Sequence, residues 1–276
     1  MESPLIVRKH PRLKNPYMVV GWIDAGLVGI SIADYLIEKL GAEEFAEIEP
    51  PGFSFWPLTL VKGGVLQEIE YAANSFYYWK NKKGNNDLIL FGGKPPELRQ
   101  YIFANLMVDL AELFKVKRIY TVGGLMTDAG DTDNPKVFAV VNNSRLKKHV
   151  AQHGVELGQD YHGPAAMNSL LLGVAKHRGL EGVGLFGEVA KDIVEMPDLQ
   201  VHEEILGALT EMLGLDIKTG EMDGLIGHLG QHHQERGHLS GKSQGIIPEI
   251  SEEDKQIFFA EIEKFLKKDD KPGEKA

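Results

Sequence analysis

The stretch at residues 17–40 constrains the fold more than any other part of the chain. The apolar run at 18–23 is typical of a buried strand, and a tight turn with Asp24 and Gly26 follows it. From residue 27 to residue 40, apolar side chains recur at helical spacing. A strand, a glycine-containing turn and a helix form the opening unit of an α/β domain. In such sheets, ligand sites form beyond the carboxyl ends of strands, so this turn is the first place to search for a site.

The same alternation continues along the chain. The predicted buried strands are residues 87–91, 118–122, 136–141 and 182–186, and the predicted helices are 98–114, 144–153, 165–177 and 199–213. This pattern predicts an α/β fold with a mostly parallel sheet and helices on both faces. Gly63 and Gly64 lie between two β-rich runs and indicate a hairpin. The sheet is therefore expected to be mixed.

Composition excludes several classes of function. The 276 residues carry a net charge of −10, which argues against a nucleic-acid surface because phosphate binding needs clustered Lys and Arg. The chain has no cysteine, so disulfides, thiol catalysis and cysteine-based zinc sites are excluded. No apolar stretch approaches the roughly 18 residues of a membrane helix, and the N-terminus lacks a secretory apolar segment. We therefore expect a cytoplasmic protein without membrane or nucleic-acid partners.

The C-terminal part of the chain differs from the rest in composition. The organisation predicted from this difference is an α/β domain at 1–229, a His- and Gly-rich linker at 230–250, a helix at 251–268 and a disordered tail at 269–276. Ser251 begins the helix in a capping-box-like pattern, and an apolar stripe follows. Because this stripe is too apolar to stay exposed, the helix is expected to dock on its own domain or on a neighbouring subunit.

Six residues near the predicted strand ends are candidate ligand contacts: Asp24, Gly26, Gly93, Gly124, Asn168 and Glu188. The spacing of Gly21, Gly26 and Gly29 does not match the dinucleotide pattern G-x-G-x-x-G. It favours a tight turn with close helix–sheet packing over an anion site at the helix N-terminus. The glycine pairs at 92–93 and 123–124 allow either a close approach of the backbone to a ligand or a sharp turn.

Glu188 and Asn168 leave the chemistry of this crevice open. Glu188 follows a predicted strand, and Asn168 lies in the first turn of a predicted helix. A carboxylate at a strand end can act as a base, hold a ribose hydroxyl or cap a neighbouring helix. No Ser-His-Asp set and no P-loop accompanies it, so no catalytic residue is assigned and an enzyme is the weaker interpretation.

The only cluster with metal-like spacing consists of His228, His232 and His233, together with His238. His228 and His232 would face one way on a helix, but the neighbouring glycines disfavour a helix. The ligand set is incomplete, which favours adventitious binding of nickel or zinc over a native metal site. No metal and no other cofactor is expected.

Five segments, taken in order, resemble the proteasome assembly chaperone family. They are residues 21–36, 90–96, 116–125, 163–173 and 184–188, of which 116–125 reads Val-Lys-Arg-Ile-Tyr-Thr-Val-Gly-Gly-Leu. The resemblance spans about residues 17–229. It implies one phosphorylase-like three-layer α/β/α domain, homo- or hetero-oligomers and, in some members, binding to proteasome α-subunits. Those members dock through a C-terminal hydrophobic–Tyr–any tripeptide, whereas this sequence ends in Glu-Lys-Ala, so docking of that kind is not expected.

Two functions from different classes follow from these observations. The first is a non-catalytic assembly or scaffolding factor whose partners are its own copies and proteasome-like or other protein subunits. The second is a phosphorylase-like enzyme or a nucleoside or nucleotide binder that uses the strand-end crevice. A homo-oligomer is expected because aromatic residues gather in two segments interpreted as exposed loops: Phe53, Phe55 and Trp56, then Phe76, Tyr77, Tyr78 and Trp79.

Overall fold

The computed structural model describes residues 3–49, 52–54, 58–70, 74–127, 135–190 and 199–217. In this part of the chain, nine strands form one sheet in the order β1-β3-β6-β7-β2-β8-β11-β9-β10. The strands are β1 (Leu5–Val7), β2 (Tyr17–Trp22), β3 (Glu43–Ile48), β6 (Asn74–Trp79), β7 (Leu88–Gly93), β8 (Arg118–Thr127), β9 (Val137–Val141), β10 (Glu156–Leu157) and β11 (Glu181–Ala190).

The centre of the sheet is parallel and its flanks are mixed. Strands β7, β2, β8 and β11 run parallel to one another, whereas β6 pairs antiparallel with β7 and β9 pairs antiparallel with β11. The central strands are nearly continuous apolar runs, as expected for strands that are covered on both faces. The predicted α/β fold with a mixed, mostly parallel sheet is therefore confirmed.

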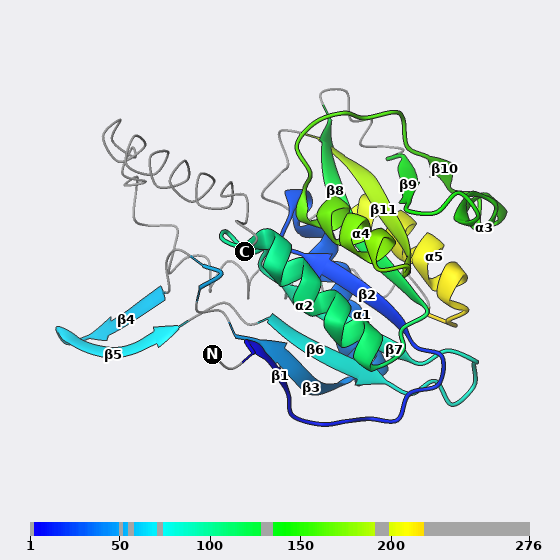
Figure 1. Ribbon diagram of the computed structural model, residues 1–276. Helices are drawn as coiled ribbons and strands as arrows, with labels where there is room; N and C mark the ends of the chain where they lie inside the picture. Colours follow the sequence, from blue (N-terminus) through cyan, green and yellow to red (C-terminus); the bar gives the residue numbers. More distant parts are fainter. Residues whose placement is uncertain are drawn as a thin grey trace, which may run out of the picture. The chain divides into compact units, whose positions relative to one another are not determined.

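Helices cover both faces of the sheet and bury two cores. They are α1 (Val28–Leu40), α2 (Gln100–Leu113), α3 (Leu146–Gln152), α4 (Met167–His177) and α5 (Leu199–Leu213). Helices α1, α3 and α5 pack over one core, and α2 and α4 pack over the other. In Figure 1, α2 and α4 lie in front of the sheet. The side chain of each central strand residue therefore faces either the α1 side or the α2 side, in alternation.

The predicted hairpin forms, but it does not join the large sheet. Strands β4 (Leu58–Lys62) and β5 (Val65–Glu70) pair only with each other among the described strands. Gly63 and Gly64 both have positive φ, at 57° and 76°. Two successive left-handed residues are what a two-residue turn of type I′ requires. The antiparallel pairings of the large sheet come instead from β1, β3 and β6, which the sequence pattern did not predict, and from β9, which it predicted as a buried strand.

The aromatic residues expected in exposed loops lie mostly inside the fold. Residues 76–79 belong to β6, and Phe76 is fully buried. Tyr77, Tyr78 and Trp79 are partly buried and pack against the two cores. Phe53 is also buried, at 3% exposure. The interpretation of residues 76–79 as an exposed loop was wrong because alternate aromatic residues of an antiparallel strand cover its own sheet.

Several predictions fall outside the described residues. They concern Phe55 and Trp56, the histidines His228, His232 and His233, the linker at 230–250, the helix at 251–268 and the tail at 269–276. Within the ranges that the structure describes, no helix has both the length and the apolar character needed to cross a membrane.

Candidate functional site

The turn between β2 and α1 brings backbone against backbone. A methyl group built on Gly21 would lie 1.9 Å from the carbonyl oxygen of Gly29, and one on Gly29 would lie 2.8 Å from the carbonyl oxygen of Val122. Only glycine permits this approach. The predicted tight turn with close helix–sheet packing is therefore confirmed, and Gly21 and Gly29 serve packing.

Asp24 fastens this turn to the neighbouring strand. Its Oδ1 accepts a hydrogen bond from the backbone N–H of Gly29 at 3.0 Å, and its Oδ2 accepts one from the N–H of Gly124 at 2.9 Å. Burial raises the pKa of Asp24 to about 7, because desolvation of the carboxylate outweighs these hydrogen bonds, which lower the pKa. The side chain therefore changes between an acceptor and a donor near neutral pH.

Asp24 and Asn168 converge over Gly123 in β8. A methyl group on Gly123 would lie 2.5 Å from Asp24 Oδ2 and 2.8 Å from Asn168 Nδ2. Asn168 stands in the first turn of α4, and its Nδ2 donates to the carbonyl oxygen of Val122 at 3.4 Å. Two side chains from distant parts of the sequence thus fill the space that glycine leaves on the α2 side of the sheet.

Gly93 in β7 is covered in a similar way. Gly93 pairs with Trp22 on one side and with Asn74 on the other. A methyl group on Gly93 would lie 2.7 Å from Asn74 Oδ1. Trp22 packs edge-on against Phe91, with ring centroids 4.9 Å apart, inside the α2-side core.

These residues form one transverse row at the carboxyl edge of the sheet. Gly21 pairs with Val122, so the next residue of each strand places Trp22 beside Gly123. We use the name polar row for the strand positions Gly93, Trp22 and Gly123 together with the side chains that lie over the two glycines. These side chains are Asn74 over Gly93, and Asp24 and Asn168 over Gly123. Neighbouring strands lie about 4.8 Å apart, so the three strand positions span roughly 10 Å.

Three buried polar atoms of the row have no hydrogen-bond partner within the described residues. They are Trp22 Nε1, Asn74 Oδ1 and Asn168 Oδ1. The three residues are 1%, 5% and 7% exposed, respectively. Thr121 lies two residues before Gly123 in β8 and faces the same side of the sheet. Its Oγ1 also has no hydrogen-bond partner among the described residues. Each buried polar atom left unpaired costs about 1–3 kcal/mol, so such a concentration at one edge calls for a physical reason.

The six candidate ligand contacts therefore fall into groups according to where the structure places them. Asp24, Gly124 and Asn168 come together around Gly123, and Gly93 lies two strands away in the same row. Gly26 has a φ of 65° and faces Val189, and a methyl group on Gly124 would lie 2.1 Å from the carbonyl oxygen of Ala25, so both also have packing roles. Glu188 pairs with Leu125 at the same edge and is partly buried. A ligand role for all six stays a prediction.

Sequence reasoning did not select Trp22, Asn74 or Gly123 individually. Gly123 stood in the glycine pair at 123–124, and the alternation of a strand would have placed it on the opposite face from Gly124. Trp22 and Asn74 lie inside strands, where their residue types give no sign of missing partners. Their role becomes visible only when the strand register aligns them.

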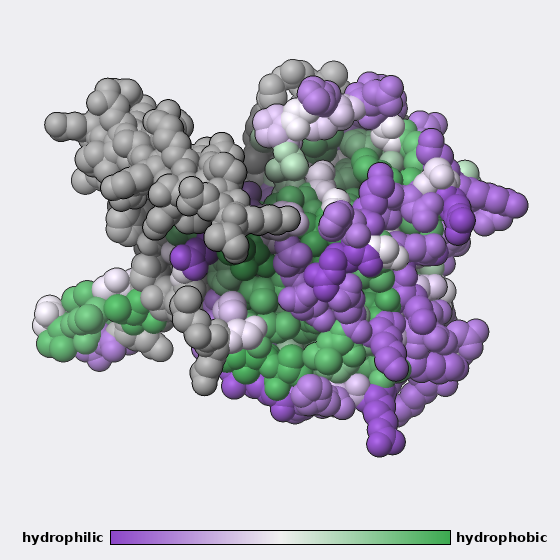
Figure 2. Space-filling view, viewed as in Figure 1, coloured by the Kyte–Doolittle hydropathy of each residue, from purple (hydrophilic) through white to green (hydrophobic). Residues whose placement is uncertain are grey.

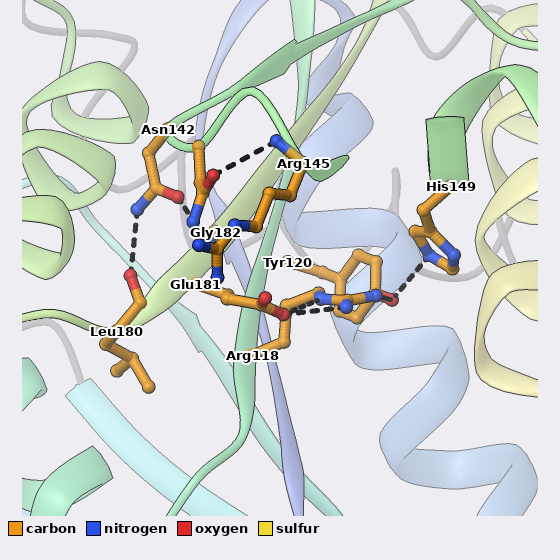
Figure 3. A network of polar contacts seen from close by, with 9 residues as sticks. Arg118, Tyr120, Asn142, Arg145, His149, Leu180, Glu181 and Gly182 are labelled. Carbon is orange, nitrogen blue, oxygen red and sulfur yellow. Dashed lines mark hydrogen bonds and ion pairs between the residues drawn. The ribbon is translucent and has the colours of Figure 1, made fainter. Parts of the chain in front are cut away.

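The amino edge of the same sheet carries a polar network with well-formed contacts. Arg118 donates to Glu181 Oε2 from Nη2 at 2.7 Å and from Nε at 3.0 Å, and it donates to the Tyr120 hydroxyl at 3.1 Å. That hydroxyl also lies 3.2 Å from His149 Nε2. Burial, assisted by the nearby Arg118, lowers the pKa of His149. Figure 3 shows these side chains bridging β8, β11 and α3.

Asn142 completes this network. Its Nδ2 donates to the carbonyl oxygens of Leu172 and Leu180 at 3.2 and 2.9 Å, and its Oδ1 accepts from the N–H of Gly182 at 2.8 Å. The side chain ties β9 to the connection between α4 and β11 (Figure 3). An open cavity of about 410 Å³ lies beside it, lined by polar groups that include Lys176 and Glu181.

The chemistry of the polar row favours binding over catalysis. It offers an indole N–H, two amide oxygens and a carboxyl group with a pKa near neutrality, and it contains no hydroxyl or thiol nucleophile next to a base. Within the described ranges, no group of three or more His, Asp or Glu side chains is placed to hold a metal ion. The row thus presents neutral hydrogen-bonding groups beside one titratable carboxyl.

The fold and this edge define a three-layer α/β/α protein with a parallel centre. Residues 18–226 match the PAC2 family, and the chain belongs to that family. The resemblance to proteasome assembly chaperones is thereby confirmed. A search of curated proteins gave no match.

Solved structures that share this fold include the following three. PbaB of Pyrococcus furiosus, an archaeal proteasome activator, is 27% identical with a TM-score of 0.69, covering 84% of this chain and 97% of PbaB. PbaA of the same organism, an archaeal homolog of proteasome-assembly chaperone, is 19% identical with a TM-score of 0.65, covering 85% and 96%. A proteasome-assembly chaperone homologue from Mycobacterium tuberculosis is 16% identical with a TM-score of 0.66, covering 83% and 96%.

Proposed function

We propose that this protein is a non-catalytic assembly or scaffolding factor that binds subunits of a proteasome-like complex. The observation that carries this proposal is the similarity to PbaB, an archaeal proteasome activator, at 27% identity over 84% of the chain. Membership of the PAC2 family supports it. The exposed apolar residues of this chain give the role a physical basis.

The hairpin of β4 and β5 exposes apolar side chains on both of its faces. Val61, Leu66 and Ile69 are 54%, 56% and 50% exposed on one face, because Val61 pairs with Leu66 and the bulge in the hairpin places Ile69, opposite Thr59, on that same face. Val65, opposite Lys62, is 60% exposed on the other face. The hairpin is accordingly mostly green in Figure 2. A two-stranded hairpin is marginally stable in water without further packing, so we infer that a protein partner covers it.

The carboxyl edge of the large sheet adds a second apolar surface. Leu125 and Met126 at the end of β8 are about half exposed, as are Tyr101 and Ile102 in the first turn of α2. Clusters of exposed apolar residues mark protein contacts more often than isolated ones do. We propose that partner subunits contact this edge as well as the hairpin.

Self-association accompanies this role in our proposal. A hairpin with two apolar faces can be covered on one face by a second copy of the chain. Light scattering at micromolar concentration should therefore give a mass well above the 30.6 kDa of one chain. A mass equal to that of the monomer would contradict the homo-oligomer.

Partner binding can be tested with purified proteasome α-subunits from the same organism. Wild-type protein should co-elute with them in size-exclusion chromatography. Val65→Lys on the hairpin should weaken binding by at least about tenfold, because it places a charge in an apolar contact. Leu113→Lys, at a position 54% exposed at the end of α2, is the matched control and should bind like wild type. If wild-type protein fails to bind, the proposed function is wrong.

A further inference from the structure

The buried unpaired atoms of the polar row are concentrated on one face and one edge of the sheet. Trp22, Thr121 and Gly123 face the α2 side, as their alternation with core residues requires. Asn168 reaches the same side from α4. In folded proteins, the great majority of buried polar atoms find a partner. Several exceptions close together call for a partner that the described residues do not supply.

The atoms left free define what that molecule must offer. Trp22 Nε1 is a donor only, so it requires an acceptor. Asn74 Oδ1 and Asn168 Oδ1 are acceptors, so they require donors. An acceptor beside a donor is the pattern of an amide edge, as in a lactam ring. The row spans roughly 10 Å across three strands, which suits one or two fused rings.

Charge narrows the class of ligand further. Asp24 lies over Gly123, and none of the hydrogen bonds or ion pairs among the described residues brings a Lys or Arg into the row. Lys94, just beyond Gly93, is paired with Glu97 at 2.7 Å. A phosphate would therefore meet a carboxyl group without a compensating cation, which is unfavourable in a buried site.

We propose that the polar row binds a small uncharged ring with an amide edge, of the nucleobase or nucleoside class. Trp22 Nε1 donates to its carbonyl oxygen, and Asn168 Oδ1 or Asn74 Oδ1 accepts from its N–H groups. The three atoms are buried in this structure, so the side chains over Gly93 and Gly123 must move aside when the ring enters. This site goes beyond the assembly role and does not depend on it.

Ordered water is the rival occupant of the row. Buried waters commonly satisfy such atoms, and water would confer no preference among added ligands. Thermal unfolding of the full chain with uracil, hypoxanthine, uridine and inosine at millimolar concentration separates the two. Ligand binding to the native state raises the melting temperature. We expect a rise with at least one of these four compounds and none with inorganic phosphate.

Two conservative variants locate the effect. Trp22→Phe removes the indole N–H and keeps an aromatic ring against Phe91, and Asn168→Leu replaces the amide with an apolar group of similar size. Each should weaken the affinity measured by calorimetry at least about tenfold. Asn105→Leu, at a partly buried position of α2 where the side chain donates to the carbonyl oxygen of Tyr101, is the matched control and should bind like wild type.

The outcomes that overturn the proposal are distinct from failure of the assembly role. No shift with any of the four compounds, or a shift that persists in both Trp22→Phe and Asn168→Leu, would leave water as the occupant. Equal shifts with uridine and with inorganic phosphate would also contradict the neutral class. Binding of proteasome α-subunits is measured separately and is expected to be unchanged in both variants.

Discussion

The two edges of the large sheet treat their polar groups in opposite ways. At the amino edge, Arg118, Glu181 and Asn142 make short, reciprocal contacts that join strands to helices. At the carboxyl edge, Trp22 and Asn168 carry buried polar atoms that no described residue satisfies. Satisfied networks hold a fold together, whereas unsatisfied buried groups persist at sites where function requires them. The comparison assigns architecture to one edge and binding to the other.

Asn142 and Asn168 show the contrast within one residue type. Asn142 makes three side-chain hydrogen bonds between 2.8 and 3.2 Å. The Asn168 side chain makes one hydrogen bond among the described residues, at 3.4 Å, and its Oδ1 has no partner there. The same side chain is thus a structural bridge in one place and a candidate ligand contact in the other.

The largest effect should come from the carboxyl-edge glycine that has a structural role. Gly21→Ala places a methyl group against the backbone of Gly29, which cannot move without shifting α1. We expect a loss of at least about 3 kcal/mol in unfolding free energy, measured by urea titration.

Gly123→Ala provides the matched comparison. Its methyl group would meet only the ends of the Asp24 and Asn168 side chains, which can rotate. The loss should be clearly smaller than for Gly21→Ala. Equal losses would mean that the polar row is as rigid as the α1 junction and would weaken its assignment as a ligand site.

An intermediate effect should come from breaking the amino-edge network. Arg118→Met removes the ion pair with Glu181 and the contacts with the rings of Tyr17 and Tyr120. We expect a loss of about 1–3 kcal/mol, because the Arg118 side chain is 14% exposed and well ordered by its partners. Unchanged stability in urea would show that this network is dispensable.

A smaller effect should appear in the pH dependence of stability. The pKa of Asp24 is raised from 3.8 to about 7 in the native state, so the native protein retains a proton that the unfolded chain releases near pH 4. Stability from this group is fully present below about pH 4 and is lost as the pH rises through about 7. Burial raises this pKa, but the Asp24 residue keeps some exposure to solvent, which screens the effect, so the change in unfolding free energy should be on the order of 2 kcal/mol or less.

Asp24→Asn isolates this contribution. The variant has no titrating group at this position, so its stability should fall less than that of wild type between pH 5 and pH 8. Urea titrations at the two pH values give the change in stability for each protein. Subtracting the change in the variant from that in wild type cancels the contributions of the other titrating groups. A fall as steep in the variant as in wild type would show that Asp24 is not the titrating group.

The sequence predicted the parallel centre and the helices but missed four strands. The central strands are apolar runs that sequence periodicity detects, as residues 118–122 show. Strand β3 reads Glu-Glu-Phe-Ala-Glu-Ile, with two exposed residues at its start, and β6 reads Asn-Ser-Phe-Tyr-Tyr-Trp. Flanking antiparallel strands with partly exposed faces lack the continuous apolar pattern, and β1 and β10 are only three and two residues long.

The candidate site was predicted only in part, for a related reason. Asp24, Gly124 and Asn168 stand out because they follow a strand or open a helix, and the carboxyl-edge rule then groups them. Trp22 and Asn74 join the row through strand register, which depends on pairings between distant segments. Periodicity along one strand carries no information about those pairings.

One measurement tests the difference between the two edges most directly. Wild type, Asn142→Leu and Asn168→Leu are unfolded in urea with and without whichever of the four compounds stabilises wild type most. The account predicts that Asn142→Leu loses about 2–4 kcal/mol but keeps the stabilisation by that compound, whereas Asn168→Leu is at least as stable as wild type and no longer responds to it. Equal destabilisation of both variants, with the response to the compound retained in both, would contradict it.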